Sequence, residues 1–223
     1  MTNQGKLFIV ATPIGNYGDI SLRAIETLKH ADSVACEEFR EGSTLLKKIG
    51  INEKKLILLN EHNDKEGTEE IIQALLSGQT IALVSDCGTP AFADPGTILV
   101  KRCMEYGIPV SSVTGASSLM AAISLSPLPL KEFYFAGFLP RAETERKVKL
   151  AFLKTQKIPI IIMDTPYRLG KLLNEISLSF GRNHVVTLGV DLTMPSESLL
   201  HGPVGEISVK MKDRKGEFIL IVH

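Results

Sequence analysis

The chain has 223 residues, 44% of them apolar and 22% charged, a composition that excludes an intrinsically disordered or fibrous protein. Its 25 basic and 25 acidic side chains cancel, which argues against a protein that coats nucleic acid by bulk charge. No apolar run approaches the ~20 residues that span a bilayer, and the first residues lack the apolar stretch of a signal peptide. We therefore expect a cytoplasmic protein with no membrane partner.

Short apolar runs alternate with helical patterns through the first half of the chain. Strands are predicted at residues 7–11, 33–36, 56–59, 80–85 and 109–113, and helices at 21–29, 44–49, 66–76 and 95–106. This alternation predicts an α/β domain with a mostly parallel sheet and helices on both of its faces.

A domain boundary is predicted near residues 114–129, where Gly115, a run of small residues and two prolines interrupt the alternation. We divide the chain into an N-terminal domain, residues 1–114, and a C-terminal domain, residues 115–223. In the second domain, strands are predicted at 132–138, 158–163, 184–190 and 217–223, with short strands between the last two, and helices at 144–154 and after 166.

Metal ligation is not expected from the histidines and cysteines. The three cysteines, Cys36, Cys87 and Cys103, cannot all pair and show no ligand spacing, and the five histidines form no ligand pattern. Reduced thiols in a cytosolic protein are the simplest interpretation.

Three loops each follow a buried strand, which is where open parallel sheets place their ligands. They are Ala-Thr-Pro-Ile-Gly-Asn-Tyr-Gly-Asp at 11–19, Ser-Asp-Cys-Gly-Thr-Pro-Ala-Phe-Ala-Asp-Pro-Gly at 85–96 and Thr-Gly-Ala-Ser-Ser at 114–118. None has the Gly-x-Gly-x-x-Gly spacing of a dinucleotide fold, and no P-loop occurs in the chain, which argues against nicotinamide and nucleoside triphosphate ligands.

Each loop also has a purely structural interpretation. The first is compatible with an ordinary turn, and the third with close packing of a helix start on the sheet rather than with an anion site. In the second loop, two glycines and two prolines make an ordinary short connection less plausible, while Asp94 is expected only to cap the helix that begins at Pro95.

Taken together, the segments Ala-Thr-Pro-Ile-Gly-Asn (11–16), Ser-Asp-Cys-Gly-Thr-Pro (85–90) and Gly-Ala-Ser-Ser-Leu (115–119) resemble the class III, tetrapyrrole methylase-type, methyltransferases that use S-adenosylmethionine. The likeness is greatest to the ribosomal RNA small subunit (cytidine-2′-O)-methyltransferases. It extends over nearly the whole chain through Asp-Ile-Ser-Leu-Arg-Ala (19–24), Glu-His-Asn (61–63), Gly-Phe-Leu-Pro-Arg (137–141) and Thr-Pro-Tyr-Arg (165–168).

The resemblance implies two α/β domains, of which the second has a mixed sheet. It implies that S-adenosylmethionine binds, folded, in the cleft between the two domains, and that the protein is a homodimer. It also implies which residues contact the cofactor. These are Pro13 of the first loop, Cys87, Gly88, Thr89 and Phe92 of the second, Ser117 and Ser118 of the third, Met163 at a strand end of the second domain, and Leu192 in a more loosely matched segment. For Met163 a place in the core is the alternative.

A sugar hydroxyl is a poor nucleophile, so a general base beside it would accelerate methylation of RNA. Glu37, Glu38 and His62 lie near predicted strand ends and are the candidates, with Glu37 and His62 preferred. Their structural alternatives are an ion pair of a glutamate with Arg40 and a turn capped by His62.

Guanidinium groups bind phosphate oxygens bidentately, which makes three arginines, Arg40, Arg141 and Arg168, the candidates for substrate binding. Residues 141–171 contain eight basic side chains against three acidic ones, a net charge of +5. We expect this segment, including Arg146 and Lys147, to bind the RNA backbone, although a solvated helix face would explain the run equally well.

The chain also departs from the rRNA branch at several substrate-side positions. It has Glu-Glu-Phe-Arg (37–40) where the branch usually has Glu-Asp-Thr-Arg, Asp-Thr-Pro-Tyr-Arg (164–168) where the branch tends to read Glu-Ser-Pro-His-Arg, and Val-Asp-Leu-Thr-Met (190–194) in place of Arg-Glu-Leu-Thr-Lys. Ribosomal RNA or the small ribosomal subunit is thus the expected partner. A tetrapyrrole or other small acceptor, and an inactive module that only binds the cofactor, stay open as alternatives.

Overall fold

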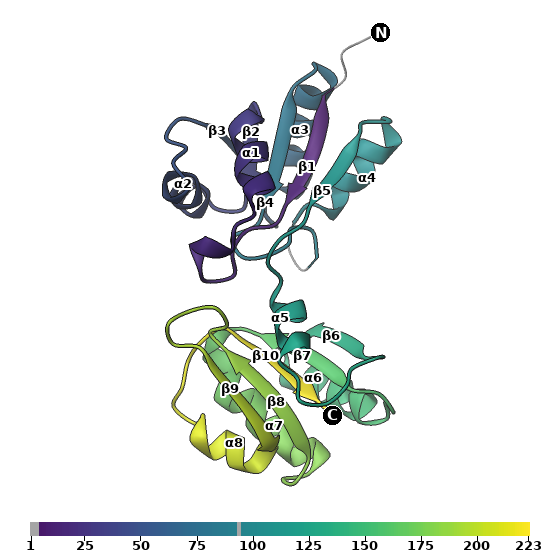
Figure 1. The fold of residues 1–223 in the computed structure, drawn as a ribbon. Coiled ribbons are helices and arrows are strands. Elements are labelled where there is room, and N and C mark those ends of the chain that lie inside the picture. The colour runs from purple at the N-terminus through teal and green to yellow at the C-terminus, as the bar shows by residue number, and fades with distance from the viewer. Residues whose placement is uncertain (1–4, 93–94) are drawn as a thin grey trace. The chain divides into compact units, whose positions relative to one another are not determined.

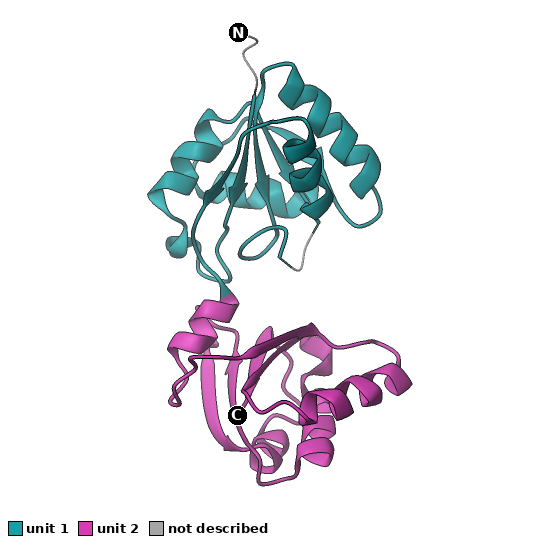
Figure 2. Cartoon of the chain, turned by 90° about the vertical axis from the view of Figure 1, so that its right-hand side faces the viewer, with its two compact units in different colours: residues 1–117 teal, residues 118–223 magenta. Residues whose placement is uncertain are grey.

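The computed structural model describes residues 5–92 and 95–223, so the cap predicted at Asp94 lies outside it. Contacts divide the chain into two compact units, Met1–Ser117 and Ser118–His223, coloured separately in Figure 2. Each unit contains one five-stranded sheet.

Unit 1 is built on a fully parallel sheet with the strand order β3-β2-β4-β1-β5 (Figure 1). Its strands are β1 (Lys6–Val10), β2 (Ser33–Cys36), β3 (Lys55–Leu58), β4 (Thr80–Val84) and β5 (Val110–Val113), and its helices are α1 (Leu22–His30), α2 (Phe39–Lys48), α3 (Asp64–Leu76) and α4 (Thr97–Glu105), with a short 3-10 helix η1 (Tyr17–Asp19). The predicted parallel sheet is confirmed.

The central strand β4 shows why this sheet has helices on both faces. Its alternate side chains enter two different cores: Ile81 and Leu83 pack with residues of α3 and α4, whereas Ala82 and Val84 pack with residues of α1 and α2. Burial on both faces explains why the strand reads as a continuous apolar run rather than an alternating one.

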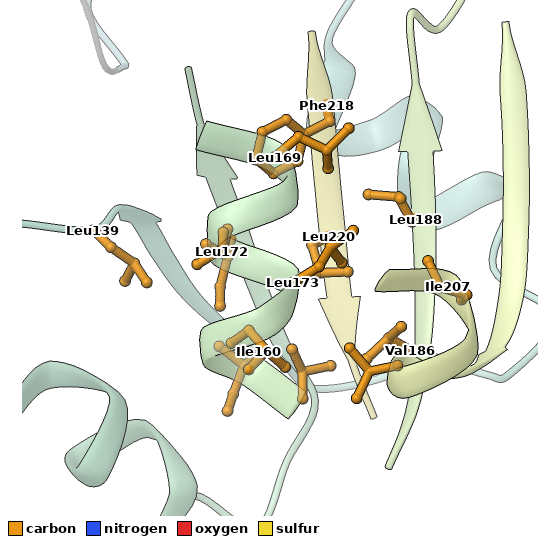
Figure 3. Packing of buried hydrophobic residues seen from close by; sticks show 14 of the residues in the cluster. Leu139, Ile160, Leu169, Leu172, Leu173, Val186, Leu188, Ile207, Phe218 and Leu220 are labelled. Carbon is orange, nitrogen blue, oxygen red and sulfur yellow. The ribbon is translucent and has the colours of Figure 1, made fainter. Parts of the chain in front are cut away.

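Unit 2 contains a mixed sheet with the order β6-β7-β10-β8-β9, in agreement with the expected fold class. β6 (Tyr134–Phe138) and β7 (Ile160–Asp164) are parallel, whereas β10 (Phe218–Val222) runs antiparallel to β7 and to β8 (Val185–Val190), and β9 (Ser198–Pro203) runs antiparallel to β8. The helices are α5 (Ser118–Ser124), α6 (Glu143–Lys154), α7 (Leu169–Phe180) and α8 (Val204–Lys210), with a 3-10 turn η2 (Pro166–Arg168). Figure 3 shows its core, in which Leu172 and Leu173 of α7 belong to one buried cluster with Leu188 and Leu220 of the sheet.

Two helices differ from the predictions. α2 begins at Phe39, five residues before the predicted start. Gly42, which weakens a helix intrinsically, is buried there close to Cys36, where an added Cβ would lie 2.8 Å from Sγ. α8 was not predicted, since its β-branched residues favour a strand; it forms because Val204 and Ile207 are buried in the core of unit 2.

Candidate functional site

All five strands of unit 1 are parallel, so their carboxyl ends and the loops that follow them lie at one edge of the sheet. This topology brings together residues that are far apart in the sequence. Pro13 follows β1, Glu37 follows β2, His62 follows β3, residues 87–89 follow β4 and Ser117 follows β5. Ser118 is the first residue of α5 and belongs to unit 2.

Hydrogen bonds join the first loop to the second. The backbone N–H of Thr12 donates to the carbonyl of Gly88 at 2.8 Å, and the hydroxyls of Thr12 and Ser85 lie 3.3 and 3.2 Å from the same oxygen. Thr12 and Ser85 are 2% and 4% exposed. The carbonyl of Gly88 is therefore held toward the sheet, while its neighbours Cys87 and Thr89 are exposed. Sequence reasoning missed these two buried hydroxyls, although both lie inside the quoted motifs.

The loop after β4 requires glycine at position 88. Gly88 has φ +85°, and an added Cβ would lie 3.3 Å from Cγ2 of Ile14 and 3.8 Å from the carbonyl oxygen of Ala116. The hydroxyl of Thr89 donates to that same carbonyl at 3.4 Å. The three loops thus form one continuous rim. Ala91 also has a positive φ, +61°, and the following Phe92 is 55% exposed, an unusual exposure for an aromatic ring.

The loop after β3 is ordered by two asparagines rather than by His62. Asn63 accepts from the backbone N–H of Asn60 at 2.7 Å through Oδ1 and donates to the carbonyl of Leu58 at 2.9 Å through Nδ2. Asn60 in turn accepts from the backbone N–H of His62 at 3.1 Å and donates to the carbonyl of Glu37 at 3.4 Å. The exposed imidazole of His62 is therefore not needed to cap this turn.

Negative charge gathers at the ends of β2 and β4. Burial, together with the nearby carboxylates of Asp86, Glu38 and Glu37, raises the pKa of the Cys36 thiol to about 11. The thiol therefore stays protonated at neutral pH and is chemically inert. The three carboxylates lie close enough to act on the same thiol, and they give this part of the edge an acidic character.

In unit 2, β6, β7 and β8 run in the same direction and end at one edge, close to Arg141, Met163 and Leu192 respectively. Met163 is half-buried near the end of β7, and Leu192 is 7% exposed. The adjacent Asp191 has φ +50° and accepts hydrogen bonds from Arg214 at 2.6 Å and from Ser196 at 3.0 Å.

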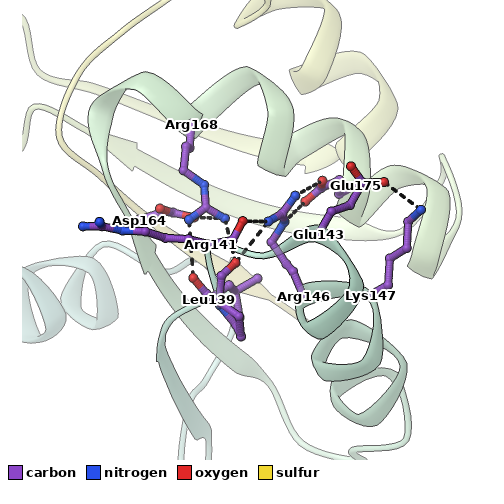
Figure 4. Close-up of polar contacts among 9 residues, drawn as sticks. Leu139, Arg141, Glu143, Arg146, Lys147, Asp164, Arg168 and Glu175 are labelled. Atoms are coloured by element: carbon purple, nitrogen blue, oxygen red, sulfur yellow. Dashed lines mark hydrogen bonds and ion pairs between the residues drawn. The ribbon is translucent and has the colours of Figure 1, made fainter.

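Arg146 does not belong to an RNA-binding surface, and our prediction for it is wrong. Its side chain is 2% exposed and forms a two-fold ion pair with Glu175, with N–O distances of 2.7 and 2.8 Å. Its Nη1 also donates to the carbonyls of Pro140 and Arg141 at 3.0 and 2.8 Å. Arg146 therefore holds the segment after β6 in place, as Figure 4 shows.

Arg168 holds the same segment from the other side. It pairs with Asp164 at 3.2 Å, and its guanidinium donates to the carbonyls of Leu139 and Pro140, each at 3.4 Å. Burial raises the pKa of Asp164, an effect that the Thr165 N–H and Arg168 oppose. Arg141 itself is exposed, as is Arg40 on α2. The two candidates Arg141 and Arg40 can thus reach a ligand without rearrangement, whereas Arg168 already has protein partners.

Within residues 5–92 and 95–223, no three His, Cys, Asp or Glu side chains are grouped so as to hold a metal ion. None of the helices described there is both long and apolar enough to cross a membrane.

The family model of tetrapyrrole (corrin/porphyrin) methylases matches residues 6–208 of the chain. Several curated relatives carry the name ribosomal RNA small subunit methyltransferase I. The protein from Xylella fastidiosa is 38% identical over all of this chain and 83% of its own length, that from Escherichia coli O157:H7 is 39% identical over 99% and 78%, and that from Halalkalibacterium halodurans is 40% identical over 99% and 76%.

Among solved structures, the uroporphyrin-III C-methyltransferase from Thermus thermophilus superposes with a TM-score of 0.64 at 20% identity, over 98% of this chain and 94% of its own. A cobalt precorrin-4 methyltransferase of cobalamin biosynthesis gives a TM-score of 0.68 at 17% identity, over 97% and 94%. At these identities the structures establish the shared fold.

Proposed function

The chain belongs to the tetrapyrrole (corrin/porphyrin) methylase family and is a methyltransferase, and from this premise we propose that it methylates the ribose 2′-hydroxyl of a cytidine in small-subunit ribosomal RNA, with S-adenosylmethionine as methyl donor. The choice of acceptor rests on one observation, the sequence identity to curated relatives. The curated relatives named for ribosomal RNA are 38–40% identical over nearly the whole chain, whereas the tetrapyrrole enzymes of the same fold are 17–20% identical.

The rim of unit 1 fits this donor in two respects. Glycine at position 88 lets the backbone of the second loop pass close to Ile14 and Ala116, where a side chain would crowd the point at which the three loops meet, and glycine also permits close approach of a ligand. The carboxylates of Asp86, Glu37 and Glu38 complement a cationic ligand. We assign Pro13, residues 87–89, Phe92 and Ser117 of unit 1 to cofactor binding, and from unit 2 Ser118, Met163 and Leu192. The donor supplies an electrophilic methyl group bound to a sulfonium sulfur. When the methyl group is transferred, the sulfur is left as a neutral thioether.

The chain's own task in this reaction is alignment, exclusion of water and removal of one proton. As the ribose oxygen forms its bond to the methyl carbon, its proton passes to a base. Glu37 and His62 follow the neighbouring strands β2 and β3, and the side chain of His62 is exposed. We place the base at one of these two residues, and assign Arg40 and Arg141 to the phosphates that flank the acceptor, with Arg168 as a further phosphate contact.

The substitutions Glu37→Gln and His62→Asn identify the base. The variant that lacks it should lose about 10²- to 10⁴-fold in kcat, and the other should stay within a few-fold of the parent protein. Titration calorimetry with S-adenosylmethionine is the control, because neither change should weaken cofactor binding more than a few-fold. If both variants keep full kcat, neither residue is the base.

The acceptor is tested by methyl incorporation from labelled S-adenosylmethionine into protein-free small-subunit rRNA, small ribosomal subunits, and uroporphyrinogen III. We expect incorporation into one or both RNA substrates and none into the tetrapyrrole. Incorporation into the tetrapyrrole alone would favour the alternative that the acceptor is a tetrapyrrole. That alternative is supported by the fold shared with the uroporphyrin-III C-methyltransferase. Cofactor binding without transfer to any acceptor would favour an inactive module. An rRNA acceptor also implies action in the cytoplasm, and from the resemblance we expect a homodimer.

A further inference from the structure

A basic pocket of about 550 Å³ lies in unit 2, between α7 and the segment that joins α8 to β10. Its wall contains four basic side chains and one acidic one, Asp213; the basic ones are Lys171, Lys212, Arg214 and Lys215. The reaction proposed above uses none of them.

The walls of this basic pocket are fixed by contacts within unit 2. An added Cβ at Gly170 would lie 2.9 Å from the carbonyl oxygen of Lys212, so α7 and the segment after α8 are in direct backbone contact there. Arg214 anchors the same segment by donating to Asp191 at 2.6 Å and to the carbonyl of Ser196 at 3.1 Å. No ion pair within the described ranges involves Lys212 or Lys215. Their ammonium groups are therefore available to an anionic ligand.

An aromatic ring stands beside these charges. Tyr167 is 79% exposed, and the Nζ of Lys215 lies 5.3 Å from its ring centroid. Asn174 and Ser208 add neutral hydrogen-bonding groups to the lining. Proteins that bind single-stranded nucleic acids combine cations that follow the backbone with aromatic rings on which bases stack. The basic pocket with Tyr167 has both components.

We propose that the basic pocket holds the backbone of a single-stranded RNA segment, with a phosphate between Lys212 and Lys215 and a base stacked on Tyr167. This inference rests on the proposed function and adds a surface that receives RNA outside the acceptor nucleotide. Two connections place it beside the carboxyl edge of the unit 2 sheet. Tyr167 is three residues beyond Asp164, the last residue of β7, and Arg214 bonds Asp191, which directly follows β8.

The phosphate contact is tested by measuring the affinity of the full chain for a fluorescent single-stranded RNA of about 16 nucleotides at several salt concentrations. The double variant Lys212→Gln/Lys215→Gln should bind more weakly and lower the log–log salt slope by about 1.4, which is 0.7 per lost contact with a single strand. The matched control is Lys55→Gln/Lys101→Gln. It removes the same charge from exposed positions of unit 1, at the first residue of β3 and on α4, outside every segment assigned to RNA. Its slope should equal that of the parent protein.

The stacking contact is tested with Tyr167→Ala and Tyr167→Phe. The alanine variant should lose about tenfold in RNA affinity, while the phenylalanine variant keeps it, and neither should change the affinity for S-adenosylmethionine. Equal slope changes in the two lysine pairs, or unchanged RNA binding by Tyr167→Ala, would overturn the inference even if rRNA is methylated. A parent protein that methylates only a tetrapyrrole would overturn the proposed function, and with it this pocket's role.

Discussion

At the residue scale, Gly88 is the position on which cofactor binding should depend most. Gly88→Ala places a methyl group 3.3 Å from Ile14, at the junction of the three loops. The matched control is Gly107→Ala, because Gly107 also has a positive φ, +65°, but has nothing within 4 Å of an added Cβ. Both changes carry a backbone cost of about 1–2 kcal/mol.

Only Gly88→Ala should weaken the binding of S-adenosylmethionine, by about tenfold or more in titration calorimetry. Thermal unfolding should show destabilisation of both variants, and somewhat more for Gly88→Ala, whose methyl group also crowds Ile14. Equal cofactor affinities for Gly88→Ala and Gly107→Ala would show that the cofactor does not approach this loop.

The three thiols give a second test of the same loop. Burial raises the pKa of Cys36 and that of Cys103 to about 11, so both stay protonated at pH 8, whereas Cys87 is exposed on the second loop. Because the thiolate is the reactive form, a disulfide reagent should modify one thiol rapidly in the native protein. Saturating S-adenosylmethionine should slow that reaction, and Cys87→Ser should abolish it. Rapid modification of two thiols, or no protection by the cofactor, would contradict the assignment.

Residue-scale prediction from sequence succeeds where a local pattern carries the information. The glycine and proline pattern of residues 85–96 indicates an unusual loop, and the structure gives Gly88 a positive φ there. The burial of Arg146 cannot be inferred from the neighbouring sequence, because charged residues flank it and its partner Glu175 lies on another helix. A net-charge count over residues 141–171 therefore misplaced it among exposed cations.

At the element scale, Arg146 joins α6 to α7 and to the segment after β6. Replacing it with methionine would leave the carboxylate of Glu175, 18% exposed, without its partner and would free the carbonyls of Pro140 and Arg141. We expect a loss of about 3 kcal/mol in the free energy of unfolding. The control is Lys147→Met, whose ion pair with Glu143 is exposed on α6, and it should change stability little. Urea denaturation that gives the two variants equal midpoints would contradict this role.

The strand β4 and the helix α8 illustrate which elements can be predicted from the sequence. β4 reads as a continuous apolar run because both of its faces are buried, and it was predicted within a residue. α8 was missed because its local sequence favours a strand. Its helical form depends on the burial of Val204 and Ile207 against residues that are distant in the sequence.

At the scale of the whole molecule, family and fold were predictable because ordered motifs extend over nearly the entire chain. The acceptor was less predictable, since the segments at 37–40, 164–168 and 190–194 differ from the rRNA branch. Some of these residues form ion pairs within the protein: Asp164 with Arg168, and Asp191 with Arg214. Their departures from the branch therefore alter contacts within the protein as well as groups open to substrate.

Identification of the methylated product decides whether the protein modifies a cytidine ribose of ribosomal RNA. Small-subunit rRNA and small ribosomal subunits are incubated with the protein and isotopically labelled S-adenosylmethionine, and the RNA is digested to nucleosides for mass spectrometry. We expect label in 2′-O-methylcytidine, and loss of that label with Gly88→Val. Label in a base, in another nucleoside, or only in a tetrapyrrole supplied alongside the RNA would contradict it.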